Sequence, residues 1–219
     1  MAKINFKFKA VIFDMDGVIT NTMPCHFQAW AATFKSIGIK VNCYDIYKRE
    51  GQAGLTSVKE ILREHGRKIN PETAGQILAQ KEKLFKRIVK IRFVKGSRGF
   101  IKLLKKRNFL LGLVTGTSRH EVLKIMPKKL LGNFDVSVTG DEVKKGKPHP
   151  EPFARALKKL NLCWPDAVVL ENAPLGIEAA KNAGLFCIAL ETSLPRKYLK
   201  KADFVFKSYP ELIKSIHFK

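Results

Sequence analysis

The sequence predicts an α/β fold in which a parallel, Rossmann-like sheet forms the core and an all-helical cap domain is inserted near its beginning. The first observation is a series of short apolar runs, which are typical of strands buried on both faces. The second is that segments with helical periodicity separate these runs. The third is a stretch from about residue 22 to 93 in which helical patterns follow one another without a strand.

Five apolar runs are predicted to form the strands of the sheet, and a sixth is predicted at its edge. They cover residues 10–13, 110–114, 134–138, 167–170, 186–190 and, at the edge, 204–206. Segments with helical periodicity lie between them, at residues 99–107, 119–126, 151–160 and 175–183. Because strands and helices alternate, we expect parallel strands with helices packed on both faces.

The predicted cap consists of amphipathic helices at residues 24–38, 55–66 and 72–90. No strand pattern separates them, so we assign residues 21–93 to the cap and residues 1–20 and 94–219 to the core. A chain of 219 residues with 45% hydrophobic residues is long enough to bury a core in a domain with such an insertion.

The composition limits the possible partners. The chain has 41 lysine and arginine residues against 19 aspartate and glutamate residues, a formal net charge of +22. This balance favours anionic partners, yet the lysines are scattered along the chain and no nucleic-acid-binding motif is present. We therefore interpret them as a solvated surface and expect a small phosphorylated substrate. A nucleic-acid binder without enzymatic activity is the least favoured hypothesis.

No segment resembles a signal peptide or a membrane span, because the apolar run near the N-terminus is only four residues long. The wide spacing of the four cysteines argues against a zinc site. These observations predict a cytoplasmic protein without a membrane partner. We further expect a monomer or a weak oligomer.

Polar side chains follow the predicted strands at the ends where an open parallel sheet binds its ligands. These residues are Asp14, Asp16, Thr115, Lys147, Glu171 and Asn172. Any one of them alone is also a common turn or capping residue. Their occurrence in order at four strand ends makes that interpretation poor for the set as a whole.

Asp14 and Asp16 are the candidate catalytic pair. A carboxylate directly after a buried strand is costly unless it has a function. Gly17 frees the backbone to turn, so that the second carboxylate approaches from the side. This arrangement fits a nucleophile at Asp14 and a general acid/base at Asp16.

The strand ends at residues 115–117 and 147 supply groups for a phosphoryl group. Thr115 and the amides of Gly116 and Thr117 are predicted to bind phosphoryl oxygens. Lys147 is predicted to neutralise charge on the nucleophile and on the transferring group. No GxxxxGK[ST] sequence is present, which excludes a P-loop NTPase.

A magnesium site is predicted at the same edge of the sheet. Mg²⁺ prefers oxygen ligands, and Asp14 together with the tip formed by Glu171 and Asn172 provides them. The cofactor expected from these residues is therefore Mg²⁺.

Four ordered motifs, "FDMDGV", "VTGTS", "KGKPHPEPF" and "LENAPLGIEAAKNAG", resemble those of the haloacid dehalogenase-like hydrolases. The likeness covers essentially the whole chain and is strongest to the β-phosphoglucomutase-like phosphatases, which carry a helical cap after the first motif. It implies an aspartyl-phosphate mechanism in which Asp14 attacks phosphorus and Asp16 protonates the leaving group and then activates water. It also implies that Asp14, the main-chain carbonyl of Asp16 and the acidic tip bind Mg²⁺.

Residues of the cap are expected to select the substrate. His26 occupies a position where β-phosphoglucomutases also carry a histidine, which either couples cap closure to Asp16 or lies on the helix surface. Glu50 and Gly54 stand where those mutases carry a lysine and an arginine for a distal phosphate, although Arg49 compensates if the register differs by one. These departures make a sugar-phosphate mutase the alternative rather than the first prediction.

The stretches "REGQAG" and "ENAPLG" resemble a phosphatase branch that includes inorganic pyrophosphatases. Asn172 stands where many relatives have aspartate, and its amide contributes no charge. We expect Glu171, near the metal or its waters, and Glu50, descending from the cap, to make up that charge. The alternative for Glu50 is an ordinary charge at a helix end. The resulting prediction is a Mg²⁺-dependent phosphatase for a small phosphorylated metabolite or pyrophosphate.

Overall fold

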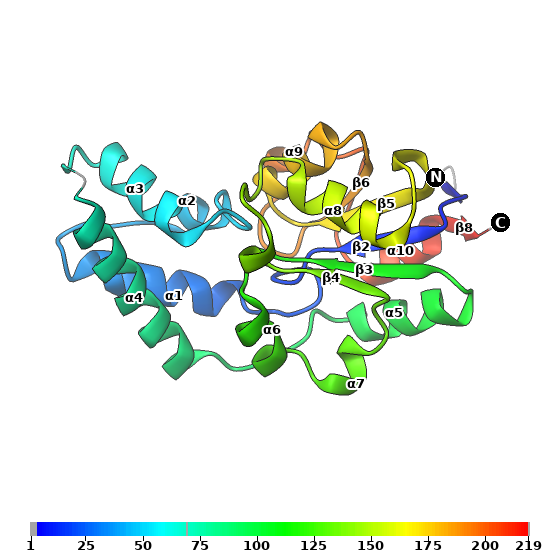
Figure 1. The fold of residues 1–219 in the computed structure, drawn as a ribbon, viewed down its shortest axis with the longest axis horizontal. Coiled ribbons are helices and arrows are strands. Elements are labelled where there is room, and N and C mark those ends of the chain that lie inside the picture. The colour runs from blue at the N-terminus through cyan, green and yellow to red at the C-terminus, as the bar shows by residue number, and fades with distance from the viewer. Residues whose placement is uncertain (1–3, 69, 219) are drawn as a thin grey trace.

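The computed structural model describes residues 4–68 and 70–218. Its core is a six-stranded parallel sheet in the order β4-β3-β2-β5-β6-β7. The strands are β2 (Ala10–Phe13), β3 (Leu110–Val114), β4 (Val136–Val138), β5 (Ala167–Glu171), β6 (Phe186–Leu190) and β7 (Phe204–Phe206). Figure 1 shows helices packed around this sheet and a separate group of helices to its left, which confirms the predicted fold class.

The register of the sheet brings the candidate residues together. Phe13, the last residue of β2, pairs with Leu113 on β3 and with Leu170 on β5. The segments that follow these three strands therefore leave the sheet at the same edge and next to one another.

Each face of the sheet has its own apolar core. The side chains of β2 alternate, so that Val11 and Phe13 enter one core and Ala10 and Ile12 enter the other. The first core includes residues of α5 (Ser97–Lys106), α6 (Arg119–Ile125), α7 (Lys128–Leu131) and α10 (Tyr209–Ser215). The second includes residues of α8 (Glu151–Leu160) and α9 (Pro174–Asn182).

The cap contains α1 (Met23–Lys35), α2 (Cys43–Tyr47), α3 (Gly54–Glu64) and α4 (Pro71–Ile88). These helices bury a third apolar core, which includes Trp30, Phe34 and Ile61. The sequence did not predict α2, because five residues are too few to show a helical period. Asn42 begins this helix by accepting a hydrogen bond from the amide of Asp45.

The two ends of the cap leave the core together. The amide of Asn21 donates a hydrogen bond to the carbonyl of Arg92 over 2.8 Å, and Thr20 pairs with Phe93 in an antiparallel bridge. This pairing supports the predicted boundaries, and residues 21–93 remain our proposed extent of the cap.

Some elements differ from the sequence-based expectation. The strand predicted at 134–138 begins only at Val136, because the amide of Phe134 closes a turn on the carbonyl of Leu131. A second, two-stranded sheet pairs β1 (Ile4–Phe6) with β8 (Ile216–Phe218). The sequence did not predict either of these strands.

Short 3-10 turns at Gly140–Glu142, Trp164–Asp166 and Arg196–Tyr198 connect elements of the core. Among the helices of the described residues, none combines the length and the apolarity that crossing a bilayer requires.

Candidate active site

Three buried titratable side chains meet at the strand ends. Lys147, in the loop before α8, donates hydrogen bonds from Nζ to Asp14 Oδ1 (2.6 Å) and to Glu171 Oε1 (2.5 Å). All three side chains are almost fully buried. Burial alone would lower the pKa of Lys147, but the charges of the two carboxylates raise that pKa above its ordinary value. Lys147 is therefore held as a cation beside the candidate nucleophile.

Asp14 has one engaged oxygen and one open oxygen. Lys147 binds Oδ1, whereas Oδ2 is buried without a hydrogen-bond partner among the described residues. Burial raises the pKa of Asp14 to about 8; Lys147 opposes this shift, and the charges of Glu171 and Asp16 add to it. A further positive charge at Oδ2 would favour the ionised, nucleophilic form of Asp14.

Hydroxyl groups surround Asp16. Its Oδ1 accepts hydrogen bonds from Thr22 and, over 3.4 Å, from Thr20, while Oδ2 accepts one from Thr117 over 3.3 Å. The Nε2 atom of His26 lies 3.6 Å from Oδ1. Burial raises the pKa of Asp16, but the contacts with His26 and Thr22 outweigh it and hold the pKa below its usual value. Asp16 is thus ionised, which is the form that acts as a general base.

His26 connects the cap to Asp16. It projects from α1 and stacks on Phe85 of α4, with ring centroids 4.0 Å apart. Its Nδ1 atom lies 3.2 Å from Nζ of Lys81, another residue of α4. The His26 side chain is 14% exposed, so the alternative of a surface histidine is wrong. Burial and the charge of Lys81 lower the pKa of His26, which favours a neutral ring.

Lys81, Thr20 and Thr22 were missed in the sequence. The signal for Lys81 is its place in the row Ala74, Ile77, Lys81 and Phe85, which is the buried face of α4. A lysine in the apolar row of an amphipathic helix indicates a buried, partnered charge. The two threonines have no comparable signal, because hydroxyl residues are common near turns.

Thr115, Gly116 and Thr117 follow β3 and lie beneath the cap. The amide of Thr117 donates a hydrogen bond to Thr115 Oγ1 over 3.1 Å. A Cβ atom on Gly116 would come within 3.1 Å of the carbonyl oxygen of Gly51 in the cap. The backbones of cap and core therefore approach each other closely at the predicted phosphoryl-binding residues.

The tip after β5 orients two different groups. The Oε1 atom of Glu171 accepts from Lys147, and Oε2 accepts from the amides of Asn172 (2.8 Å) and Ala173 (3.2 Å). Asn172 donates from Nδ2 to Ser193 Oγ over 2.8 Å. Its Oδ1 is buried and has no hydrogen-bond partner within the described residues. Glu171 thus orients Lys147, and the amide oxygen of Asn172 is left open.

The open oxygens fit a hard cation. Asp14 Oδ2 and Asn172 Oδ1 are buried acceptors, and Mg²⁺ takes oxygen ligands of both kinds. Across residues 4–68 and 70–218, no group of three or more His, Cys, Asp or Glu side chains is arranged to hold a metal ion. A cation here would therefore depend on amide and main-chain oxygens in addition to Asp14.

A cavity of about 360 Å³ lies between cap and core. Its wall includes Gly116 and Thr117 from the core and His26, Glu50 and Lys81 from the cap. Burial and the charges of Asp16 and Asp14 raise the pKa of Glu50 well above its usual value. Glu50 therefore lies within electrostatic reach of both aspartates.

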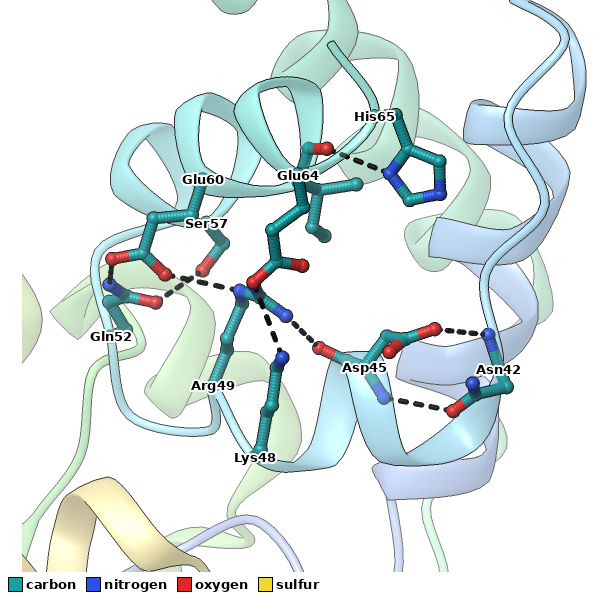
Figure 2. A network of polar contacts seen from close by, with 10 residues as sticks. Asn42, Asp45, Lys48, Arg49, Gln52, Ser57, Glu60, Glu64 and His65 are labelled. Atoms are coloured by element: carbon teal, nitrogen blue, oxygen red, sulfur yellow. Dashed lines mark hydrogen bonds and ion pairs between the residues drawn. The ribbon is translucent and has the colours of Figure 1, made fainter.

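Arg49 does not replace a distal-phosphate ligand. Its buried guanidinium bonds to Glu60, to Glu64 and to the carbonyl of Asp45, all within the cap (Figure 2). Gly54 has no side chain to offer. Neither residue therefore provides a free positive charge for a second phosphate.

Comparison with known proteins places this site in a family. Residues 11–190 match the haloacid dehalogenase-like hydrolases. The chain is 34% identical over 188 residues to the phosphorylated carbohydrates phosphatase of Thermotoga maritima, covering 81% of this chain and 82% of that protein. It is 27% identical to pyrophosphatase PpaX of Bacillus cereus, covering 94% and 95%. The β-phosphoglucomutase structure from Clostridium difficile matches with a TM-score of 0.80 at 26% identity, covering 94% of this chain and 93% of that one.

The family match spans most of the chain and contains every residue of the buried trio Asp14, Lys147 and Glu171. The β-phosphoglucomutase structure aligns with nearly all of this chain, which includes both the sheet core and the cap. This protein therefore belongs to the haloacid dehalogenase-like hydrolases, in their β-phosphoglucomutase-like branch.

Proposed function

We propose that this protein is a Mg²⁺-dependent phosphatase that hydrolyses a small phosphorylated metabolite or pyrophosphate through an aspartyl-phosphate on Asp14. The observation that carries this proposal is the buried Asp14, with one oxygen bound by Lys147 and the other left open. A carboxylate nucleophile, a fixed cation and an adjacent acid/base are the groups that such chemistry requires. Relatives named as a phosphorylated carbohydrates phosphatase and a pyrophosphatase support this substrate range.

In the first half-reaction, an oxygen of Asp14 attacks phosphorus, and the bond between phosphorus and the leaving oxygen breaks. The negative charge of the bound phosphoryl group raises the pKa of Asp16, so Asp16 takes up a proton from solvent and donates it to that leaving oxygen. Lys147 remains beside Asp14 and stabilises the charge on the transferring group, while Thr115 and the amides of Gly116 and Thr117 bind phosphoryl oxygens.

In the second half-reaction, Asp16 accepts a proton from water. The water oxygen attacks phosphorus, the bond between phosphorus and Asp14 breaks, and phosphate leaves. The lowered pKa of Asp16 suits this base step. His26 supports it by directing its Nε2 proton toward Asp16.

Asp14 Oδ2, Asn172 Oδ1 and the main-chain carbonyl of Asp16 would hold the magnesium ion. Both oxygens of Glu171 already accept hydrogen bonds, so we propose that Glu171 acts near the ion through Lys147 or water. Glu50 would add the charge that Asn172 lacks. When bound, the ion neutralises charge on Asp14 and on the phosphoryl group.

A sugar-phosphate mutase is the second candidate, because the fold matches a β-phosphoglucomutase structure closely. The engaged guanidinium of Arg49 and the carboxylate of Glu50 argue against a binding site for a second phosphate. With β-glucose 1-phosphate and a bisphosphate activator, we expect free phosphate and no isomerised product. Isomerised product would favour the mutase.

A phosphate-release screen tests the proposed function. It covers sugar phosphates, nucleotides and pyrophosphate, each with Mg²⁺ and with a chelator. We expect release from at least one small compound in the presence of Mg²⁺ and little without it. Release that is equal in both conditions, or absent from every compound, contradicts the proposal.

A further inference from the structure

A closed polar ring in the cap holds the segment that carries Glu50. Residues 49–52, here called the Glu50 loop, begin with Arg49 and end with Gln52. Both of these residues bind Glu60 of α3 (Figure 2). Arg49 Nε donates to Glu60 Oε2 over 3.1 Å, and Gln52 Nε2 donates to Glu60 Oε1 over 2.8 Å. One carboxylate therefore fastens both ends of the loop.

Further contacts limit the movement of this ring. Arg49 is buried, its Nη1 atom donates to the carbonyl of Asp45 over 2.5 Å, and its Nη2 atom pairs with Glu64. Ser57 donates to Gln52 Oε1 over 3.2 Å. The charged bonds of Arg49 are stronger than the neutral bond of Ser57, so the arginine end is the firmer of the two.

The tip of the Glu50 loop fits closely against the core. Gly51 has a φ angle of +80°, and a Cβ atom there would lie 2.4 Å from Cδ of Lys147. On the other side, a Cβ atom on Gly116 would lie 3.1 Å from the carbonyl oxygen of Gly51. The tip therefore reaches the lysine that binds Asp14, and it leaves no room for a side chain at Gly51.

The Glu50 loop also forms part of the cavity wall. Glu50, Gly51 and Gln52 line the cavity between cap and core together with Gly116 and Thr117 of the core. The two bonds of Glu60 to Arg49 and Gln52 lie on either side of Glu50 in the chain. They therefore bear directly on where Glu50 lies in that wall.

We propose that Glu60 is a positioning residue that holds Glu50 at the edge of the active site by binding both ends of its loop. The same bonds engage Arg49 inside the cap and withhold it from a second phosphate. Two experiments test this proposal, one by kinetics and one by hydrogen exchange. Only the kinetic one rests on the proposed phosphatase function.

The first readout is a double-mutant cycle between Glu60 and Glu50. Glu60→Ala is expected to lower kcat/KM by about 10-fold or more in the wild-type background, as outer-shell changes commonly do. In the Glu50→Ala background the same change is expected to cost less than about 2-fold, because its effect passes through Glu50. Equal losses in the two backgrounds, or no loss in either, overturn the proposal.

Two further variants separate positioning from general destabilisation. Glu64→Ala is the matched control, because Glu64 binds Arg49 and Lys48 but not Gln52. Its loss in kcat/KM is expected to be less than about 3-fold. Gln52→Ala removes the bond between Gln52 and Glu60 without leaving a buried charge unpaired. It therefore replaces Glu60→Ala in the cycle if Glu60→Ala does not fold. It is expected to show the same dependence on Glu50, and a loss independent of Glu50 counts against the proposal.

The second readout needs no turnover. Hydrogen exchange of the amides at residues 50–52 is expected to quicken in Glu60→Ala and to quicken much less in Glu64→Ala, which keeps both bonds of Glu60, while exchange in the core sheet is unchanged. Unchanged exchange at residues 50–52 in Glu60→Ala overturns the proposal. An inactive wild-type chain would instead count against the phosphatase function, and the exchange comparison would still decide the role of Glu60.

Discussion

The Nζ atom of Lys81 lies 3.2 Å from Nδ1 of His26, and this contact determines which ring nitrogen faces Asp16. A lysine ammonium only donates hydrogen bonds, so Nδ1 is the acceptor. The proton of the neutral ring is then on Nε2, 3.6 Å from Asp16 Oδ1. Lys81 and His26, two residues of the cap, thus affect the protonation of Asp16 in the core.

Lys81→Met is expected to lower kcat by about 10- to 100-fold, as loss of an outer-shell partner commonly does. The positive charge of Lys81 lowers the pKa of His26. Its removal therefore lets His26 take up a proton at higher pH, and the acid limb of the pH–rate profile moves upward. Lys83→Met, an exposed lysine on the same helix, is the control and is expected to leave the profile unchanged. An unshifted profile in Lys81→Met contradicts this role.

Asp14→Asn is expected to abolish phosphate release, with a loss of at least about 1,000-fold, because the amide is not a nucleophile. The fold is expected to survive, since Lys147 keeps its bond to Glu171. Phosphate release and a thermal melt measure the two effects. Asp166→Asn makes the same chemical change at the partly exposed ion pair with Lys9 and is the control. Substantial remaining activity in the Asp14→Asn variant would show that Asp14 is not the nucleophile.

Stabilisation by Mg²⁺ is expected to increase as the pH rises. In the metal-free fold the pKa of Asp14 is raised from 3.8 to about 8, so folding favours its protonated form. The contribution of protonated Asp14 to the free energy of unfolding is fully present below pH 3.8 and is lost as the pH rises toward about 8. Mg²⁺ must displace this proton, so the ion binds better at pH 8.5 than at pH 6. Melting temperatures with Mg²⁺ and with a chelator measure this, and a shift that does not change with pH contradicts it.

Glu50 and Asn172 are expected to compensate for each other in charge. Glu50→Ala is expected to raise the Mg²⁺ concentration that gives half-maximal rate by about 10-fold. Asn172→Asp in the same chain restores a carboxylate at the tip and is expected to bring that concentration back toward the wild-type value. Titration of the rate with Mg²⁺ in the single and double variants measures both effects. A Glu50→Ala chain with unchanged Mg²⁺ dependence and rate would remove Glu50 from the site.

The sequence by itself determined the class of the fold and most of the candidate residues. Buried parallel strands are continuous apolar runs, so their ends are visible locally, and Asp14 and Thr115 follow such ends. The cap was visible because its three longer helices have an amphipathic period. The five-residue α2 and the four-residue α7 were not visible, because they contain too few residues for a helical period to appear. The helix α10 and the strands β1 and β8 were not predicted either, although α6 and β7, which have the same lengths, were.

Only the tertiary structure decided which side chains bind one another. Lys147 meets Asp14 across 133 residues of chain, and Lys81 meets His26 across 55. The sequence allowed Arg49 to serve a second phosphate, but in the folded cap its guanidinium bonds to Glu60 and Glu64 of α3. Periodicity records which face of an element is buried. The distance between two polar atoms depends instead on how separate elements pack, and no local pattern contains that information.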